Sequence, residues 1–212
     1  MKKTNLAQQH ETRRWIRTIY LHDNTITQLQ RSFHEQQQLP HLRLHDFLAQ
    51  HEAMTLLHYL KKATSTSEII PDRHSLQLIT ITKELQQFLT FLASPLFRDY
   101  LQQITHSRLA GSPDIQLLRF EKGNYTLLHD QDARKDALLI TFEFTEHWER
   151  AFGGYDAYLE GAEEPLLLYP TMNTFTIVRA TVCTQQFTKY INHLAQRHQR
   201  YCIRALYLIE KS

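Results

Sequence analysis

The chain has 212 residues, of which 42% are hydrophobic, and its 24 Lys and Arg against 22 Asp and Glu give a net charge of +2. This length suits one domain with one core, and the balanced charge predicts neither strong nucleic-acid binding nor membrane adhesion. The longest apolar stretches are too short to cross a bilayer, and the opening residues lack the apolar run of a secretory signal. Two cysteines, Cys183 and Cys202, do not form a CxxC pair, which argues against a disulfide framework or a zinc ribbon. We therefore expect a reduced, cytoplasmic protein.

The sequence pattern of the first half of the chain predicts helices. Apolar residues recur at helical spacing from residue 7 to about residue 38, and Asp23-Asn24 is a candidate division within this stretch. After Pro40, a second helix is predicted over residues 50–62. A third helical region is predicted over residues 83–105, with Pro95 as a break or kink. Between these two regions, residues 65–71 are predicted to form a loop.

The second half changes to short alternating segments after the turn cluster Gly111-Ser112-Pro113. About eight short strands within some hundred residues are typical of a sandwich, barrel or jelly roll. Helices first and strands second indicate an α+β protein. We expect a single domain over residues 1–212, with a mainly helical part over 1–110 and the β core over 111–212. The predicted strands are residues 115–120, 125–130, 137–144, 156–159, 166–169, 174–179, 186–191 and 201–209.

Alternation in the last strand separates two faces. Tyr201, Ile203 and Ala205 share one face, whereas Arg200 and Arg204 share the other with Cys202 and Leu206. In a jelly roll, the less apolar face would present Arg200 to the lumen of the barrel.

Several strings follow one another in a familiar order: LLRFEKGNYTLLHD (117–130), GGYDAYL (153–159), FTKYIN (187–192) and RYCI (200–203). Together they resemble the prolyl-hydroxylase type of Fe(II)/2-oxoglutarate oxygenases over about residues 115–209. They are similar in particular to the second, non-catalytic jelly-roll domain of the ribosomal prolyl hydroxylases. The resemblance implies a double-stranded β-helix, a cupin-like jelly roll, with the N-terminal helices packed on its major sheet.

The resemblance also implies an iron site, in which a His and a carboxylate two residues later lie on one face of a strand and a distant His completes the triad. His129 matches the first position, but the residue two later is Gln131, whose neutral amide is a poorer ligand for Fe(II). Asp130 and Asp132 lie on the opposite face of a regular strand. Either becomes a candidate ligand only if the strand ends in a turn at this point.

The distant His of the family precedes an arginine that binds the carboxylate of 2-oxoglutarate. Arg200 matches that arginine and could hold a carboxylate through a bidentate pair. When Arg200 is aligned with that arginine, Thr188 stands at the position of the second His. His193 becomes a candidate ligand only in a different alignment. Two of the three metal positions therefore differ from the family pattern.

Three hypotheses remain open. The first is a non-catalytic jelly-roll protein that holds no cofactor and binds a protein partner or a peptide. The second is an active Fe(II)/2-oxoglutarate dioxygenase that hydroxylates a protein side chain such as proline, using His129, Asp130 or Asp132, His193 and Arg200. The third is a barrel that binds a small molecule in the remaining anion pocket. His129 and Arg200 also have purely structural explanations. His129 could be a hydrogen-bonded strand histidine, and Arg200 could be a strand residue held in a salt bridge. The apolar stripe of the first helix additionally offers a homodimer surface.

Overall fold

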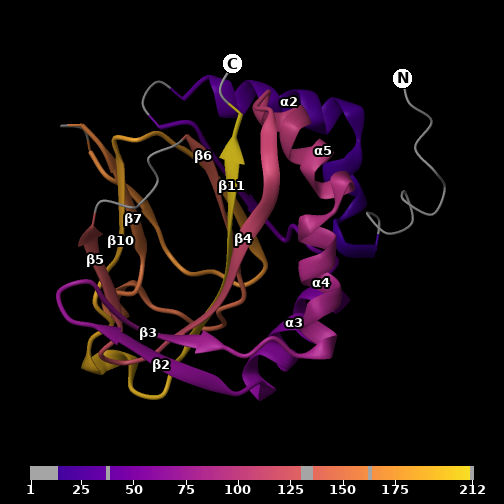
Figure 1. Ribbon diagram of the computed structural model, residues 1–212. Coiled ribbons are helices and arrows are strands. Elements are labelled where there is room, and N and C mark those ends of the chain that lie inside the picture. Colours follow the sequence, from indigo (N-terminus) through magenta and orange to yellow (C-terminus); the bar gives the residue numbers. More distant parts are fainter. Residues whose placement is uncertain (1–13, 37–38, 130–135, 162–163, 211–212) are drawn as a thin grey trace.

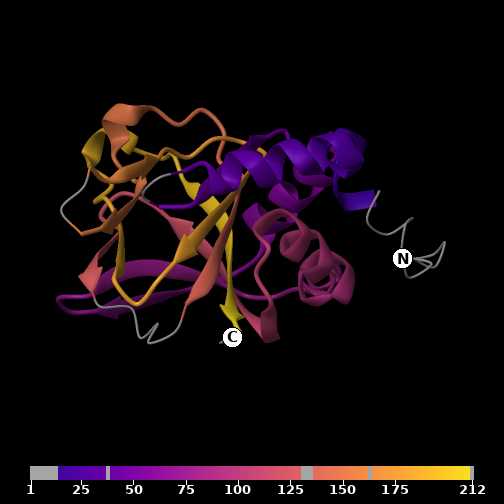
Figure 2. The same ribbon diagram turned by 90° about the horizontal axis from the view of Figure 1, so that it is seen from above.

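The computed structural model describes residues 14–36, 39–129, 136–161 and 164–210. A curled antiparallel sheet forms a barrel-like jelly roll, and the helices cover one side of it (Figures 1 and 2). This is the α+β double-stranded β-helix that the sequence predicts. The helical elements are η1 (Thr18–Leu21), α2 (Asp23–His34), α3 (Gln50–Lys62), α4 (Lys83–Ala93), α5 (Pro95–Thr105), η2 (Arg150–Phe152) and η3 (His193–Ala195).

The strands follow the order β1-β9-β6-β11-β4-β3-β5-β10-β7-β8, and β2 pairs with β3. Strands β1, β9, β6, β11 and β4 make the wall beneath the helices, and β5, β10, β7 and β8 make the opposite wall (Figure 1). Strand β3 joins the two walls because it pairs with both β4 and β5. The strands are β1 (His41–His45), β2 (Ser65–Ile70), β3 (His74–Ile79), β4 (Leu109–Phe120), β5 (Tyr125–His129), β6 (Ala137–Glu143), β7 (Asp156–Glu160), β8 (Leu166–Leu168), β9 (Thr174–Ala180), β10 (Thr184–Thr188) and β11 (Arg200–Ile209).

The helices predicted over residues 50–62 and 83–105 are present, and Pro95 divides the second of these regions into two helices. Of the first predicted region, residues 7–13 lie outside the described part of the chain. Ser94 ends α4, and its hydroxyl accepts a hydrogen bond from the backbone N–H of Phe97 in the first turn of α5. Pro95 occupies the first position of α5, where its missing N–H costs nothing. The first helical region divides at Asp23 as predicted, because α2 begins there after the short η1.

Two sequence predictions were wrong. Residues 65–71 do not form a loop, since Ser65–Ile70 and His74–Ile79 pair as the hairpin β2–β3. The Gly111-Ser112-Pro113 cluster does not end a segment but lies inside β4 as a bulge. The pairing of β4 with β11 shifts here: Asp114 is opposite Leu206, whereas the next paired residue of β4, Ala110, is opposite Leu208. Gly111 supplies the positive φ of 60° that such a bulge requires.

The main core lies between the helices and the outer face of the β9–β6–β11 wall. Phe47 stacks on Phe175 with ring centroids 4.1 Å apart, and the hydroxyl of Tyr207 donates to the carbonyl of Leu92 at 2.6 Å. Leu29 and Phe33 of α2 are buried in this core. The apolar stripe of the first helical region is therefore used within the chain itself.

The two faces of β11 are arranged as its alternation predicts. Tyr201, Ile203 and Ala205 belong to the main core under the helices. Arg200 and Arg204 lie on the other face and project into the barrel. The last strand thereby carries two guanidinium groups into the barrel, where they meet buried polar side chains of β6, β7 and β10.

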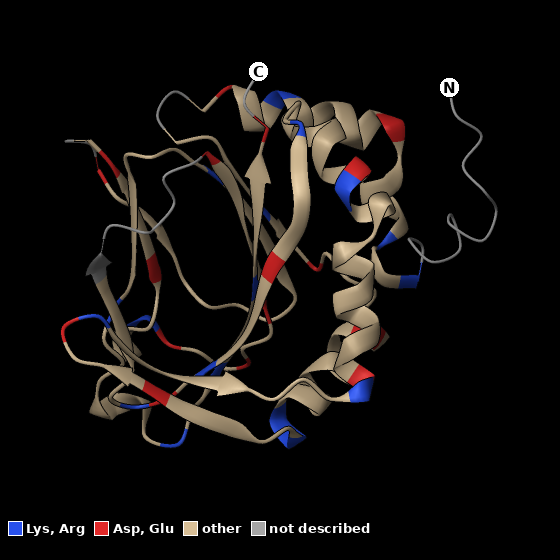
Figure 3. Cartoon of the chain, viewed as in Figure 1, with Lys and Arg blue, Asp and Glu red and all other residues tan. Residues whose placement is uncertain are grey.

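The charged residues are interspersed by sign along the helices and loops (Figure 3), in agreement with the small net charge. Among the described residues, none of the helices is long and apolar enough to cross a membrane.

Candidate binding site in the barrel lumen

Arg200 is the centre of a buried ion cluster at one end of the lumen. Its side chain is 1% exposed. Nε and Nη2 donate to Oε2 of Glu143 at 3.0 and 2.8 Å, and Nη1 and Nη2 donate to Oδ1 and Oδ2 of Asp156 at 2.9 and 2.7 Å. Nη1 also donates to the carbonyl of Gly154 at 2.8 Å. These contacts use all five N–H donors of a guanidinium.

Arg204 extends the cluster along the same face of β11. Its Nη2 donates to Oδ1 of Asp156 at 2.6 Å and to Oγ1 of Thr188 at 3.0 Å. The hydroxyl of Thr188 in turn donates to Oδ1 of Asp156 at 2.8 Å. The ring of Phe120 lies beneath both guanidinium carbons, at 5.4 Å from Arg200 and 5.5 Å from Arg204. Asp156 therefore bridges two arginines and a threonine.

Burial and charge act differently on the two acids. Burial raises the pKa of Asp156, but the positive charges of Arg200 and Arg204 outweigh it, so this pKa lies well below its usual value. Burial also raises the pKa of Glu143, and here it prevails over the opposing charge of Arg200. Burial raises the pKa of the Cys202 thiol to about 12. This thiol stays protonated at neutral pH and is a poor nucleophile.

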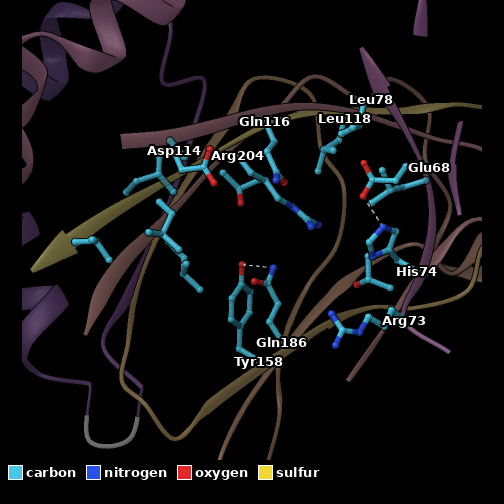
Figure 4. A pocket seen from close by; sticks show the side chains of 18 residues that line it. Glu68, Arg73, His74, Leu78, Asp114, Gln116, Leu118, Tyr158, Gln186 and Arg204 are labelled. Carbon is cyan, nitrogen blue, oxygen red and sulfur yellow. Dashed lines mark hydrogen bonds and ion pairs between the residues drawn. The ribbon is translucent and has the colours of Figure 1, made fainter. Parts of the chain in front are cut away.

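A cavity of about 430 Å³ opens next to the cluster (Figure 4). Its polar wall contains Tyr158, whose hydroxyl accepts a hydrogen bond from Nε2 of Gln186 at 3.0 Å. At its outer end, Nε2 of His74 lies 2.7 Å from Oε1 of Glu68. The remaining polar lining comes from Arg73, Asp114, Gln116, Thr126, Thr141 and Arg204, and the apolar lining from Leu76, Leu78, Leu118, Leu139, Ile140, Ala205, Leu206 and Leu208.

The candidate metal ligands are only partly described. Strand β5 ends at His129, whose backbone pairs with Gln186 of β10. The side chain of His129 and residues Asp130, Gln131 and Asp132 lie outside the described part of the chain. Within that part, there is no group of three or more His, Cys, Asp or Glu residues that could hold a metal ion.

The two candidates for the distant ligand lie in different places. Thr188 is 1% exposed and its hydroxyl belongs to the ion cluster. His193 lies in η3, beyond the end of β10, and is exposed. The structure therefore brings Thr188, Arg200 and Arg204 together in the lumen and leaves His193 at the surface.

Sequence reasoning missed the acids that pair with Arg200. Glu143 is the last residue of β6, in which every residue is buried. Asp156 directly follows Gly153-Gly154-Tyr155 and begins β7. A lone acid in an otherwise buried strand is a signal for an ion pair, since an isolated charge is rarely buried. The sequence does not show which cation is its partner.

Comparisons with known proteins agree with this architecture. A family model described as "Oxoglutarate and iron-dependent oxygenase degradation C-term" matches residues 71–212. Prolyl 3-hydroxylase OGFOD1 of Xenopus laevis is 32% identical over 87 residues, which are 39% of this chain and 17% of that protein. Its counterpart in Mus musculus is 37% identical over 81 residues, 37% of this chain and 15% of that protein. The matches thus span less than a fifth of these relatives.

Solved structures show the same fold at low sequence identity. A prolyl-4-hydroxylase of Pseudomonas putida has a TM-score of 0.67 at 10% identity, covering 86% of this chain and 99% of that one. A prolyl hydroxylase of Trichoplax adhaerens has a TM-score of 0.63 at 11% identity, covering 98% of this chain and 94% of that one. Because the family model matches well over half of the residues, the chain belongs to the "Oxoglutarate and iron-dependent oxygenase degradation C-term" family, within the Fe(II)/2-oxoglutarate oxygenase superfamily.

Proposed function

We propose that this chain is a non-catalytic jelly-roll protein of the oxygenase superfamily that acts by binding a ligand or a protein partner. One observation carries the proposal. Arg200, at the position of the cosubstrate arginine, already gives all five of its N–H donors to Glu143, Asp156 and Gly154. A 2-oxoglutarate carboxylate could bind there only by displacing one of these buried acceptors.

The position of the distant metal ligand supports the same proposal. Thr188 offers a neutral hydroxyl, and the guanidinium of Arg204 lies 3.0 Å from it. A fixed positive charge at that distance opposes a divalent cation, since like charges repel strongly in a site of low dielectric constant. The one ligand position whose side chain the structure describes therefore does not fit Fe(II), and we derive no reaction step through iron or 2-oxoglutarate.

The relatives favour one alternative. Two of them are named prolyl 3-hydroxylases, and His129 stands where the family has its first metal ligand. The alternative function is therefore an active Fe(II)/2-oxoglutarate dioxygenase acting on a protein side chain such as proline. Asp130 or Asp132 with His193 would then have to complete a rearranged triad.

Anaerobic titration with Mn(II) and 2-oxoglutarate, followed by calorimetry, separates the two functions. We expect no micromolar binding of Mn(II), and no change in the heats when His129 is replaced by alanine. The prolyl-4-hydroxylase of Pseudomonas putida serves as the positive control. Micromolar binding of Mn(II) that is lost in His129→Ala, or release of succinate from 2-oxoglutarate by the Fe(II)-loaded protein, would overturn the proposal.

The proposed partner is a protein or a peptide rather than a membrane or a nucleic acid. A homodimer through the N-terminal helices would have to use exposed residues such as Ile19 and Met54, which are 54% and 42% exposed, because Leu29 and Phe33 are already buried. Light scattering over a range of protein concentrations measures this directly, and a monomer at all of them would exclude the homodimer.

A further inference from the structure

Two guanidinium groups enter the lumen cavity, one from strand β11 and one from the turn before β3. Figure 4 shows Arg204 of β11 and Arg73, which directly precedes β3, both directed into the cavity from opposite sides. The backbone of Arg73 is fixed, because its carbonyl accepts a hydrogen bond from the N–H of Leu127 at 2.7 Å. Arg204 therefore enters the cavity from a strand, and Arg73 enters it from a turn whose backbone is bonded to β5.

Arg204 retains donors that the ion cluster does not use. Only its Nη2 is engaged, by Asp156 and Thr188. Its Nε is buried without a hydrogen-bond partner, and its Nη1 makes no hydrogen bond to any residue that the structure describes. The side chain is 19% exposed and lines the cavity. A buried donor without an acceptor is unfavourable because it has lost its hydrogen bond to water, so an acceptor supplied by a ligand would be favourable here.

The acids near the cavity do not cancel these cations. The carboxylate of Glu68 is engaged by His74 at 2.7 Å, and Asp114 is exposed to solvent, which screens its charge. In the cluster beneath, two arginines face Asp156 and Glu143, and burial raises the pKa of Glu143. The cavity therefore favours a negative group next to Arg204.

The rest of the cavity is suited to an apolar group. Its volume of about 430 Å³ falls within the range of small-molecule sites, which hold an apolar body and orient it with a few polar groups. Six leucines line it: Leu76, Leu78, Leu118, Leu139, Leu206 and Leu208.

We propose that the cavity binds a carboxylate carried by an apolar group, with the carboxylate between Arg204 and Arg73 and the apolar group on the six leucines. The carboxylate belongs either to a small monocarboxylic acid or to the C-terminus of an apolar peptide. This inference deepens the proposed binding function and rests on it. It uses Arg204 rather than Arg200, and it requires no metal.

The test is a metal-free titration of the whole chain in the presence of EDTA, followed by heteronuclear NMR. The first pair of probes is octanoate and octanamide, and the second is a tetrapeptide with two C-terminal leucines, as the free acid and as the amide. We expect the acid of at least one pair to bind at least about tenfold more tightly than its amide, because hydrogen bonds to charged groups are stronger than those to neutral groups. The pair that shows this difference identifies the source of the carboxylate.

Two variants link the binding to this cavity. Arg204→Gln removes the charge and should weaken binding of the acid at least about tenfold, whereas Leu206→Trp fills the cavity and keeps Arg204. Should Arg204→Gln fail to fold, Leu206→Trp alone decides. Arg31→Gln, on the exposed side of α2, is the matched control and should bind as the native chain does.

Equal affinities of acid and amide, unchanged binding in Leu206→Trp, or no binding of either acid at about 10 mM, where even a millimolar Kd would show, would each overturn the inference. Failure here is distinct from failure of the proposed function. The latter is measured by binding of Mn(II) and 2-oxoglutarate, both absent from this titration.

Discussion

Arg200 and Asp156 form a bidentate ion pair inside the barrel, with Nη1–Oδ1 and Nη2–Oδ2 distances of 2.9 and 2.7 Å. Their side chains are 1% and 2% exposed. The pair joins the first residue of β11 to the first residue of β7, which lie in opposite walls of the jelly roll. It thus links the two walls at the place where the superfamily resemblance expects a cosubstrate.

Replacing Asp156 by asparagine should strongly destabilise the fold. The substitution leaves Arg200 and Arg204 facing a neutral amide, and removing one partner of a buried ion pair costs about 3–5 kcal/mol. Urea unfolding followed by circular dichroism measures the free energy of unfolding. The matched control is Asp46→Asn, at an exposed pair with Arg17 with a separation of 3.9 Å, where about 0–1 kcal/mol is expected. Similar losses in the two variants would contradict a structural role for the cluster.

The two acids of the cluster should influence the pH dependence of stability in opposite directions. The folded pKa of Asp156 is lowered, so its contribution is present above the unfolded value of about 3.9 and is lost as pH falls below it. The folded pKa of Glu143 is raised. Its contribution to stability therefore falls as pH rises above the unfolded value of about 4.3, until the folded carboxyl ionises.

Urea unfolding at a series of pH values checks both signs. Asp156→Asn should reduce the loss of stability on acidification below about pH 4. Glu143→Gln should remove a decline that begins above about pH 4, and should cost less than Asp156→Asn because the folded state favours a neutral group there. Parallel stability curves for the two variants would show that the acids do not differ in this way.

Gly153 should tolerate no side chain. Its φ is 76°, and an added Cβ would overlap the backbone carbonyl of Tyr190. We expect Gly153→Ala to cost about 3 kcal/mol or more, from backbone strain together with overpacking. Gly161 has a similar φ of 68° but open space around it, so Gly161→Ala should cost only about 1–2 kcal/mol. Thermal unfolding of both variants separates the effect of close packing from that of backbone strain. Equal losses of stability would argue against a close approach of Gly153 to the Tyr190 carbonyl.

The four main helices and most strands of the second half could be predicted from the sequence because they have a strong local period. Helix α3 and strands such as β6 and β9 begin at the predicted residues or differ from them at their ends by a single residue. The hairpin β2–β3 was missed because β2 pairs only with β3 and its burial does not alternate. An edge strand half exposed on both faces leaves no period-2 signal.

The candidate site was predictable only within one strand. Alternation along β11 placed Arg200 and Arg204 on one face, and the structure has them there. Their partners Glu143 and Asp156 come from β6 and β7, and pairing between strands far apart in the chain is a tertiary property that local patterns do not carry. The same limit applies to Asn173, whose partner Leu48 lies 125 residues earlier in the chain.

Asn173 should contribute far more stability than a turn residue. Its Oδ1 accepts from the N–H of Leu48 at 3.0 Å, and its Nδ2 donates to the carbonyl of Leu48 at 2.9 Å, which ties the chain before β9 to the segment after β1. Asn173→Ala leaves both backbone groups buried without partners, at about 1–3 kcal/mol each. It also places alanine at a φ of 54°, where a further penalty of about 1–2 kcal/mol applies.

Asn173→Gly separates these two contributions. Glycine accepts the positive φ without strain, so the difference between the glycine and alanine variants measures the backbone penalty. The difference between glycine and the native asparagine measures the two hydrogen bonds to Leu48. Urea unfolding should therefore rank the native chain above Asn173→Gly, and Asn173→Gly above Asn173→Ala. A glycine variant as stable as the native chain would mean that water replaces the Asn173 side chain at Leu48 without loss.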